Sequence, residues 1–554
     1  MLQGIPGLMM DYQLTLTPIM KRAKQLYPDK KIITRFGDSY HTHTYGDFYD
    51  RCSKLANALT KLGVEAGDRI GTFAWNSYRH QELYFAVPCM GAVVHTLNLR
   101  LPADQLTYIV NHAEDKIIFV DDTLLKLIEP MVEHFETVEH FVVMCDGDLP
   151  ETSLPNALSY EALLAEASSD YDWQDIDENA AAAMCYTSGT TGNPKGALYS
   201  HRSLYLHTMA CCMTDVMQVS NSDSIMPVVP MFHAMAWGLV YAATMVGAEL
   251  VYPGAHMAPA DLAKTIADNK VTMTAGVPTL WLGLLQVLEE NPELDVSSVR
   301  AMPVGGSAAP RAMIDTYRKK YDIQIIHAWG MTELAPIGTV AQLKSNMQAW
   351  DDDAQLDVMA KQGWAVPTVE MRIVGPEGEE LPWDGETMGE LQVRGPHVVR
   401  EYYNDERSAD SFMDGWFRTG DVATIDSEGY MNIVDRTKDL VKSGGEWIST
   451  VELENTIMAH DDVLEAAVIA LPHPKWQERP LACVVKRPTA KKEDVKQGIL
   501  NLLAENFAKW QLPDDIEFID EVPKTSVGKF DKKVLRKTYQ DYQFAESEEE
   551  PAGD

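Results

Sequence analysis

The chain has 554 residues, of which 47 are Lys or Arg and 82 are Asp or Glu, so its formal net charge is −35. A hydrophobic fraction of 45% and a charged fraction of 23% are typical of a globular protein and exclude a mainly disordered chain. The acidic balance disfavours nucleic acid as the main partner, because phosphate binding needs a basic surface. At about 100–200 residues per domain, the length predicts three to five domains or subdomains.

Strand-like runs of β-branched residues alternate with helical patterns through most of the chain. Strands are predicted at residues 69–75, 116–120, 271–275 and 323–326, and helices at residues 45–62 and 260–269. This alternation predicts an α/β fold with mostly parallel sheets covered by helices. The most apolar stretch, residues 235–248, is too short to span a bilayer and predicts a buried helix.

The pattern changes after about Gly363. Short strands separated by turn residues are predicted at 371–374, 389–394 and 429–434, which indicates a smaller β-rich subdomain. An α+β pattern follows to about Tyr542, and the acidic end of the chain is predicted to be disordered.

Cysteine usage and the N-terminus bear on the cellular compartment. The cysteines are Cys52, Cys89, Cys145, Cys185, Cys211, Cys212 and Cys483. They form no C-x-x-C pair, which disfavours a zinc ribbon or a dithiol redox site, and an odd count fits reduced thiols. No basic start precedes an apolar run at residues 1–22, so we expect no signal peptide and a cytoplasmic protein.

A glycine-rich loop is the most informative segment. The sequence YTSGTTGNPKG at residues 186–196 follows a predicted strand at 180–185. Its glycines let backbone N–H groups turn inward, which suits an anion such as a polyphosphate, and Lys195 adds a positive charge. The spacing is not that of the Walker P-loop, which disfavours a P-loop kinase or NTPase. On composition alone, a flexible loop of glycine, serine and threonine that binds no ligand is an open alternative for this segment.

Six further motifs follow along the chain. They are PMFHAMAW at 230–237, VGGSAAP at 304–310, HAWGMTE at 327–333, GWFRTGD at 415–421, DRTKDLVKSGGEW at 435–447 and PKTSVGK at 523–529. With the glycine-rich loop, and in this order, they resemble the adenylate-forming superfamily of acyl-CoA synthetases, luciferase-like enzymes and peptide-synthetase adenylation domains. The resemblance covers nearly the whole chain.

The resemblance implies a fold of two unequal domains. Residues 1–436 would form an N-terminal AMP- and acyl-binding domain of two mostly parallel, helix-flanked sheets, with a β-rich subdomain at about 363–436. Residues 437–542 would form a mobile α+β C-terminal domain, followed by an acidic tail at 543–554. We expect a homodimer by the same resemblance.

The implied reaction has two steps and uses ATP, Mg²⁺ and coenzyme A. A carboxylate attacks the α-phosphate of ATP, and the thiol of coenzyme A then displaces AMP from the acyl-adenylate. The resemblance places Mg²⁺ on Thr187 and Glu333, an all-oxygen donor pair that suits an ion keeping several waters. It implies that Lys529, His233 and Glu333 take part in catalysis, with Lys529 bridging the carboxylate and the α-phosphate.

The remaining contacts to ATP and coenzyme A are also implied by the resemblance. The nucleotide would be bound by Thr187, Ser188, Gly189, Thr190, Thr191, Lys195, Ser307, Ala308, His327, Ala328, Trp329, Gly330, Met331, Thr332, Asp421 and Arg436. Coenzyme A would pass Lys438, Lys442, Gly444, Gly445, Glu446 and Trp447, with Lys438 as the hinge of the C-terminal domain. Asp421 would hold the ribose hydroxyls. Trp329 stands where many relatives have tyrosine, so it keeps an aromatic plane for adenine but lacks the phenol hydroxyl.

The acyl pocket is predicted around His233 and Trp237, which lie one helical turn apart in an apolar stretch. In related fatty acid–CoA ligases the tryptophan gates an acyl tunnel, and Gly306 and Val277 would line the same pocket. No aspartate lies between residues 226 and 238 to pair with a substrate ammonium, which disfavours an amino acid.

A medium- to long-chain fatty acid is therefore the first choice of substrate. A short thioether or branched acid such as methylthiopropionate is an alternative. Two other functions stay open. The chain is then either a nucleotide-binding family member that has lost catalysis, or an acyl-AMP ligase that transfers its product to a carrier protein. We expect neither a nucleic-acid partner nor a stable membrane anchor.

Overall fold

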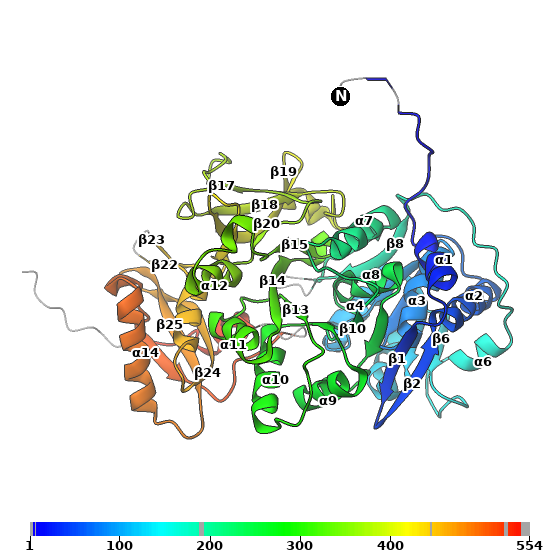
Figure 1. The fold of residues 1–554 in the computed structure, drawn as a ribbon, viewed down its shortest axis with the longest axis horizontal. Helices are drawn as coiled ribbons and strands as arrows, with labels where there is room; N and C mark the ends of the chain where they lie inside the picture. Colours follow the sequence, from blue (N-terminus) through cyan, green and yellow to red (C-terminus); the bar gives the residue numbers. More distant parts are fainter. Residues whose placement is uncertain (1–3, 6, 188–192, 444–445, 526–529, 545–554) are drawn as a thin grey trace, which may run out of the picture.

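Two large sheets form the body of the molecule in this computed structural model, which describes residues 4–5, 7–187, 193–443, 446–525 and 530–544 (Figure 1). The seven-stranded sheet has the order β7-β6-β5-β3-β4-β8-β9 and is parallel except for the β8–β9 pair. Its strands are β3 (Arg69–Phe73), β4 (Val93–Thr96), β5 (Asp115–Asp121), β6 (His140–Met144), β7 (Ala157–Ser159), β8 (Ala181–Tyr186) and β9 (Gly196–Ser200).

The nine-stranded sheet has the order β16-β15-β14-β13-β12-β10-β11-β1-β2. It is parallel from β14 to β1 and antiparallel at both edges. Its strands are β1 (Lys31–Phe36), β2 (Ser39–Thr44), β10 (Ser224–Pro227), β11 (Glu249–Tyr252), β12 (Met273–Ala275), β13 (Ala301–Val304), β14 (Gln324–Gly330), β15 (Ile337–Val340) and β16 (Trp364–Ala365).

Helices fill the space between the two sheets and cover their outer faces. The inner helices share one core with both sheets and are α1 (Thr17–Leu26), α2 (Tyr45–Lys61), α3 (Tyr78–Cys89), α7 (His201–Cys212) and α8 (Leu239–Val246). The outer face of the seven-stranded sheet packs on α4 (Ala103–Ala113) and α5 (Leu125–Ile128). The outer face of the nine-stranded sheet packs on α9 (Pro259–Asn269), α10 (Pro278–Glu290), α11 (Arg311–Tyr321) and α12 (Asp352–Ala360), and α6 (Tyr160–Ala165) lies against α2.

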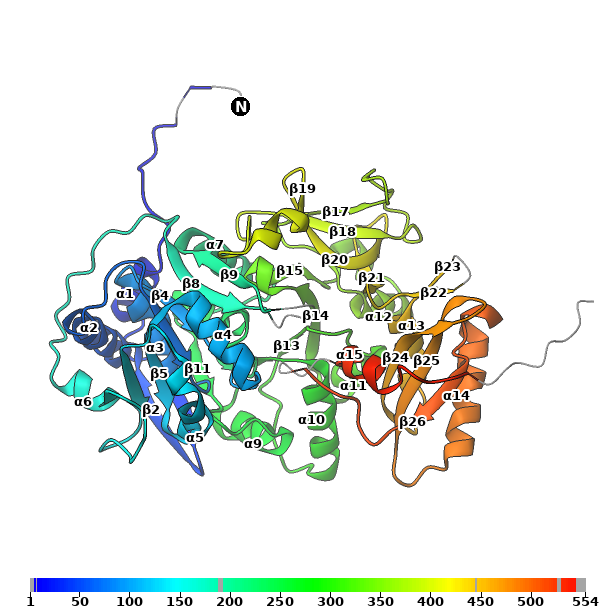
Figure 2. The same ribbon diagram turned by 180° about the vertical axis from the view of Figure 1, so that it is seen from behind.

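Two smaller units complete the fold. The β-rich unit is an antiparallel sheet of β17 (Glu370–Val374), β18 (Gly389–Arg394), β19 (Phe412–Met413), β20 (Trp416–Ile425) and β21 (Met431–Arg436). The C-terminal body contains β22 (Val441–Ser443), β23 (Glu446–Ile448), β24 (Val463–His473), β25 (Gln477–Lys486), β26 (Asp515–Phe518), α13 (Thr450–Met458), α14 (Lys492–Asn506) and α15 (Lys532–Thr538). It has its own cores and lies at the end of the molecule opposite α2 and α6 (Figures 1 and 2).

These layers confirm the predicted α/β class with a β-rich unit and an α+β C-terminal part. Every strand and helix named from the sequence pattern is present, with shifts of a few residues at the ends. The exception is the helix predicted at 235–248, which begins only at Leu239. None of the helices in the described ranges is long and apolar enough to cross a bilayer.

The C-terminal body meets β21 at a buried cluster of charges. The Lys532 ammonium lies 2.7 Å from a Glu454 carboxylate oxygen and donates to the Thr450 hydroxyl at 2.5 Å. Thr450 in turn donates its backbone N–H and its hydroxyl to Asp435, at 2.7 and 2.5 Å. Burial raises the pKa of Glu454 to about 7 and also raises that of Asp435. One lysine therefore serves two carboxyl groups inside this junction.

Candidate active site

The glycine-rich loop lies between the paired ends of β8 and β9. Thr187 and Lys195 close its base: the Thr187 N–H donates to the Lys195 carbonyl at 2.9 Å, and the Lys195 N–H donates to the Thr187 hydroxyl at 3.3 Å. Ser188, Gly189, Thr190 and Thr191 lie outside the described residues. Thr187 and Lys195, at the two described ends of the loop, nevertheless contribute a hydroxyl and an ammonium group, and both groups suit phosphate oxygens.

Glu333 is connected to Lys195 through Tyr402, a residue that sequence reasoning missed. The Tyr402 hydroxyl donates to a Glu333 carboxylate oxygen at 2.7 Å, and the Lys195 ammonium lies 4.4 Å from the centroid of the Tyr402 ring. Burial, with the Glu333 charge adding to it, raises the pKa of Tyr402, so the phenol stays a donor. Thr187 and Glu333 offer a hydroxyl and a carboxylate, and this oxygen donor set fits Mg²⁺.

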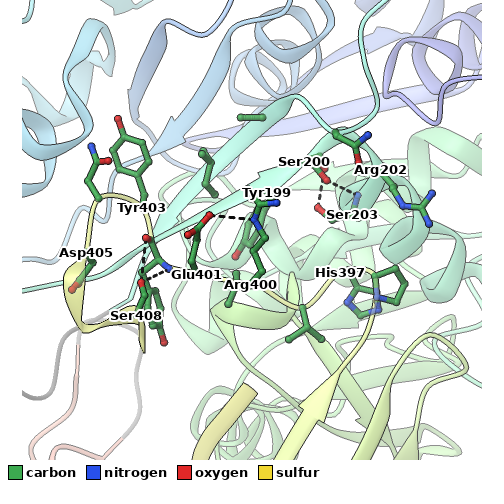
Figure 3. A pocket seen from close by; sticks show the side chains of 18 of the residues that line it. Tyr199, Ser200, Arg202, Ser203, His397, Arg400, Glu401, Tyr403, Asp405 and Ser408 are labelled. Atoms are coloured by element: carbon green, nitrogen blue, oxygen red, sulfur yellow. Dashed lines mark hydrogen bonds and ion pairs between the residues drawn. The ribbon is translucent and has the colours of Figure 1, made fainter. Parts of the chain in front are cut away.

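A hollow of about 930 Å³ opens beside this cluster, between β9, the start of α7 and residues 396–408 (Figure 3). Tyr199 and Tyr402 both line it. The Tyr199 hydroxyl donates to the Thr332 carbonyl at 2.5 Å, and the Val399 N–H donates to the Glu333 carbonyl at 2.8 Å. Segment 332–333 is therefore fixed from two sides by residues far away in the sequence.

His327 supports the predicted adenine wall from behind. Its ring is fully buried, its Nδ1 donates to the Ala360 carbonyl at 2.9 Å, and its Nε2 accepts the Ala309 N–H at 3.2 Å. Burial lowers its pKa to about 4, so the imidazole is neutral. Because both ring nitrogens bond to backbone groups, His327 fixes the loop of Ser307 and Ala308 rather than presenting a nitrogen to a ligand.

Asp421 and Arg436 meet because β20 and β21 are paired in register at these residues. Arg436 Nε lies 2.6 Å from Asp421 Oδ1. The indole N–H of Trp329 donates to Asp421 Oδ2 at 2.9 Å. Three residues predicted to bind the nucleotide are thus in direct contact, and they come from β14, β20 and the end of β21.

The predicted acyl pocket has a different backbone from the one expected. We predicted one right-handed helical turn from His233 to Trp237, and this is wrong. Residues 234–237 all have positive φ, between 42° and 55°, and Gly238 follows at 75°. The L-chirality of alanine, methionine and tryptophan disfavours this conformation by about 1–2 kcal/mol per residue, so contacts elsewhere must hold it.

The residues on both sides of this left-handed turn are constrained by tertiary structure. The side chain of Asn76 bonds to the backbone of Pro227, Val229 and Met231, which fixes the chain just before it. Gly238 follows it so close to the His207 ring that an added Cβ would lie 2.6 Å from two ring atoms. The right-handed helix propensity of these residues is overridden here by tertiary contacts, which the local sequence does not reveal.

The turn presents Trp237, which is 8% exposed, to a glycine on the neighbouring strand end. A Cβ added to Gly305 would lie 3.3 Å from Trp237 Cη2 and 2.9 Å from the Ala328 carbonyl oxygen. Gly305 therefore lies against the ring, next in the chain to the predicted pocket residue Gly306. His233 and Val277 are half-buried.

The residues predicted for coenzyme A belong to the C-terminal body. Lys442 and Trp447 face each other across β22 and β23, with the ammonium 5.4 Å from the indole centroid. Both side chains are exposed, and so is Lys438. An exposed cation and ring suit an anionic, partly aromatic cofactor. Gly444, Gly445 and Lys529 lie outside the described residues, as does the Glu446 side chain.

Comparisons with known proteins place this site in a family. The model of the AMP-binding enzyme family matches residues 20–403, and the model of the AMP-binding enzyme C-terminal domain matches residues 452–529. The chain belongs to the AMP-binding enzyme family.

Two curated relatives are similar over almost their whole length. The long-chain-fatty-acid–CoA ligase of Thermus thermophilus is 45% identical over 544 residues, 98% of each chain. The medium-chain-fatty-acid–CoA ligase of Ectopseudomonas oleovorans is 44% identical over 537 residues, 97% of this chain and 98% of that protein. The crystal structure of the anthranilate CoA ligase AuaEII with anthranoyl-AMP has a TM-score of 0.85 at 26% identity, covering 95% of this chain and 98% of that chain.

Proposed function

We propose that this chain is an AMP-forming acid–CoA ligase that converts a medium- to long-chain fatty acid to its acyl-CoA through an acyl-adenylate. The observation that carries the proposal is the full-length similarity to two fatty acid–CoA ligases, at 45% and 44% identity. The geometry supports it, because two charged clusters built from distant segments contain several of the residues predicted to bind ATP. A cytoplasmic location and a homodimer belong to the same proposal and stay predictions from the sequence.

In the first step, the fatty carboxylate attacks the α-phosphorus and pyrophosphate leaves. Two anions must meet, so the protein works mainly by alignment and charge neutralisation. Lys195 lies at the base of the phosphate loop, and Lys529 would deliver a second ammonium to the reacting oxygens. Mg²⁺ bound at Thr187 and Glu333 would neutralise phosphate charge. Tyr402 keeps the Glu333 carboxylate oriented toward that role.

In the second step, the thiol of coenzyme A attacks the acyl carbonyl and AMP leaves. The hairpin that carries Lys442 and Trp447 would need to face the site for this step, whereas Lys529 is needed in the first. We infer that the C-terminal body, from about residue 437, rotates about Lys438 between the steps. Such a rotation needs only a few residues to change φ and ψ.

The hinge is tested with Lys438→Pro, because proline fixes φ near −65°. We expect ATP–pyrophosphate exchange close to that of the unmodified chain, and thioester formation reduced by at least tenfold. Lys438→Ala is the matched control, because it removes the same side chain but leaves φ free, and it should keep more thioester formation than Lys438→Pro. Equal loss of both half-reactions in Lys438→Pro would refute the rotation.

The activity itself is tested by measuring pyrophosphate release and thioester formation with acids from butyrate to stearate and with methylthiopropionate. We expect coenzyme A-dependent thioester with the highest kcat/KM for a medium-chain acid, and loss of adenylate formation in Lys529→Ala. Adenylate that accumulates without any use of coenzyme A would indicate a ligase for a carrier protein. Absence of pyrophosphate release with every acid would indicate a nucleotide-binding protein without turnover.

A further inference from the structure

Trp329 joins the nine-stranded sheet to the β-rich unit through a single buried hydrogen bond. Its indole N–H donates to Asp421 Oδ2 at 2.9 Å, across 92 positions of sequence. Trp329 is 8% exposed and Asp421 is 2% exposed, so the bond is shielded from water. A hydrogen bond to a buried carboxylate is stronger than one between neutral groups, and it constrains the direction of the acceptor.

The β-strand beside Trp329 is shaped to receive the indole. A Cβ added to Gly338 of β15 would lie 2.4 Å from Trp329 Cζ3 and 2.6 Å from Cε3, so the ring occupies the space of a missing side chain. The pairing of β14 with β15 also shifts register between Trp329 and Gly330. Such irregularities re-aim a side chain, and a glycine in a strand marks a close approach.

The Asp421 carboxylate keeps acceptor sites that Trp329 and Arg436 do not use. An ionised carboxylate has about four acceptor sites. Arg436 Nε forms an ion pair with Asp421 Oδ1 at 2.6 Å and takes at most one site there, and the Trp329 N–H uses one site on Oδ2. Each oxygen then keeps one site, and a ribose presents two adjacent hydroxyl donors.

We propose that Trp329 is a positioning residue, whose indole N–H and seat on Gly338 orient Asp421 so that its two remaining acceptor sites receive the 2′- and 3′-hydroxyls of ATP. This inference rests on the proposed function. The indole thus acts through the carboxylate, in addition to offering a ring to adenine.

The test uses Trp329→Phe, which keeps an aromatic plane and removes the N–H donor. Pyrophosphate exchange is measured with ATP and with 2′-deoxy-ATP, together with equilibrium binding of both nucleotides. We expect the KM and the dissociation constant for ATP to rise about tenfold, with kcat changed less than threefold. The preference for ATP over 2′-deoxy-ATP should fall by at least threefold, and the KM for the acid should stay unchanged.

Two other variants separate positioning from a general effect on the fold. Gly338→Ala displaces the indole while keeping its N–H, and we expect the same fall in ribose preference. Trp364→Phe removes another indole N–H bond of the same sheet, to the Gln342 carbonyl at 3.2 Å, and should leave the preference unchanged.

The outcomes distinguish this inference from the proposed function. If Trp329→Phe weakens ATP and 2′-deoxy-ATP equally, the tryptophan serves only as a platform or a structural contact, and the inference is overturned. An unmodified chain that neither exchanges pyrophosphate nor binds ATP would overturn the proposed function, and this inference with it.

Discussion

Replacing Lys532 by methionine should loosen the C-terminal body selectively. The substitution keeps a long apolar stem but removes the ammonium that lies 2.7 Å from Glu454. Glu454 and Asp435 are 6% and 1% exposed, so two carboxyl groups would stay buried without their cation. Removing one partner of a buried ion pair costs about 3–5 kcal/mol. Since 1.36 kcal/mol corresponds to a factor of ten, opening of this region should become about 10² to 5 × 10³ times more frequent.

Hydrogen exchange of α13 peptides measures this local opening without assuming that the whole chain unfolds in one step. Lys533→Met is a matched control, because its side chain is exposed one position away. Adding Glu454→Gln to Lys532→Met should restore most of the protection, since the amide oxygen can still accept the Val468 N–H that now bonds to Glu454 at 2.7 Å. Unchanged exchange in Lys532→Met, or no recovery in the double variant, would refute the electrostatic explanation.

Three further predictions follow from the geometry. Burial lowers the pKa of His43 to about 3, so it is neutral in the fold, and its contribution to stability is lost as pH falls from 6.5 toward 3. His43→Phe should therefore gain about 2 kcal/mol relative to the unmodified chain between pH 8 and pH 5 in urea unfolding; a constant difference would contradict this. Gly305→Val should push against Trp237 and lower kcat/KM for dodecanoate at least tenfold more than for butyrate; equal losses with an unchanged KM for ATP, which reports any shift of the adjoining Ala328, would place the acyl chain elsewhere. Tyr402→Phe removes the bond to Glu333 and should raise the Mg²⁺ concentration for half-maximal adenylate formation severalfold, whereas an unchanged Mg²⁺ dependence would remove Tyr402 from that role.

The sequence pattern was sufficient for the sheets because their strands are short, β-branched and bounded by turn residues. The same pattern separated the β-rich unit from the parallel sheets, since β17, β18 and β21 are only five or six residues long and are separated by turn residues. These are local signals, and burial in the fold reinforces them.

Contacts between distant segments were beyond that reasoning. Tyr402 and Glu333 are separated by 69 residues, and no motif connects them. The left-handed turn before α8 was missed because Ala, Met and Trp favour a right-handed helix, and the contacts of Asn76, Gly238 and other distant residues that constrain the turn are not visible in the local sequence. The motif resemblance named Trp329 and Asp421 separately, but their hydrogen bond depends on how β14 and β20 come together in the fold.

The left-handed turn also limits how this enzyme can diverge. Its four non-glycine residues already occupy a costly conformation, and Gly238 has no space for a side chain. Substitutions inside the turn would therefore disturb folding before they altered which acid is accepted. Gly305 does not have a positive φ, but a Cβ there would lie 2.9 Å from the Ala328 carbonyl oxygen, so this wall also resists a larger side chain. A change in the accepted acid is therefore expected first at pocket positions outside the turn and Gly305.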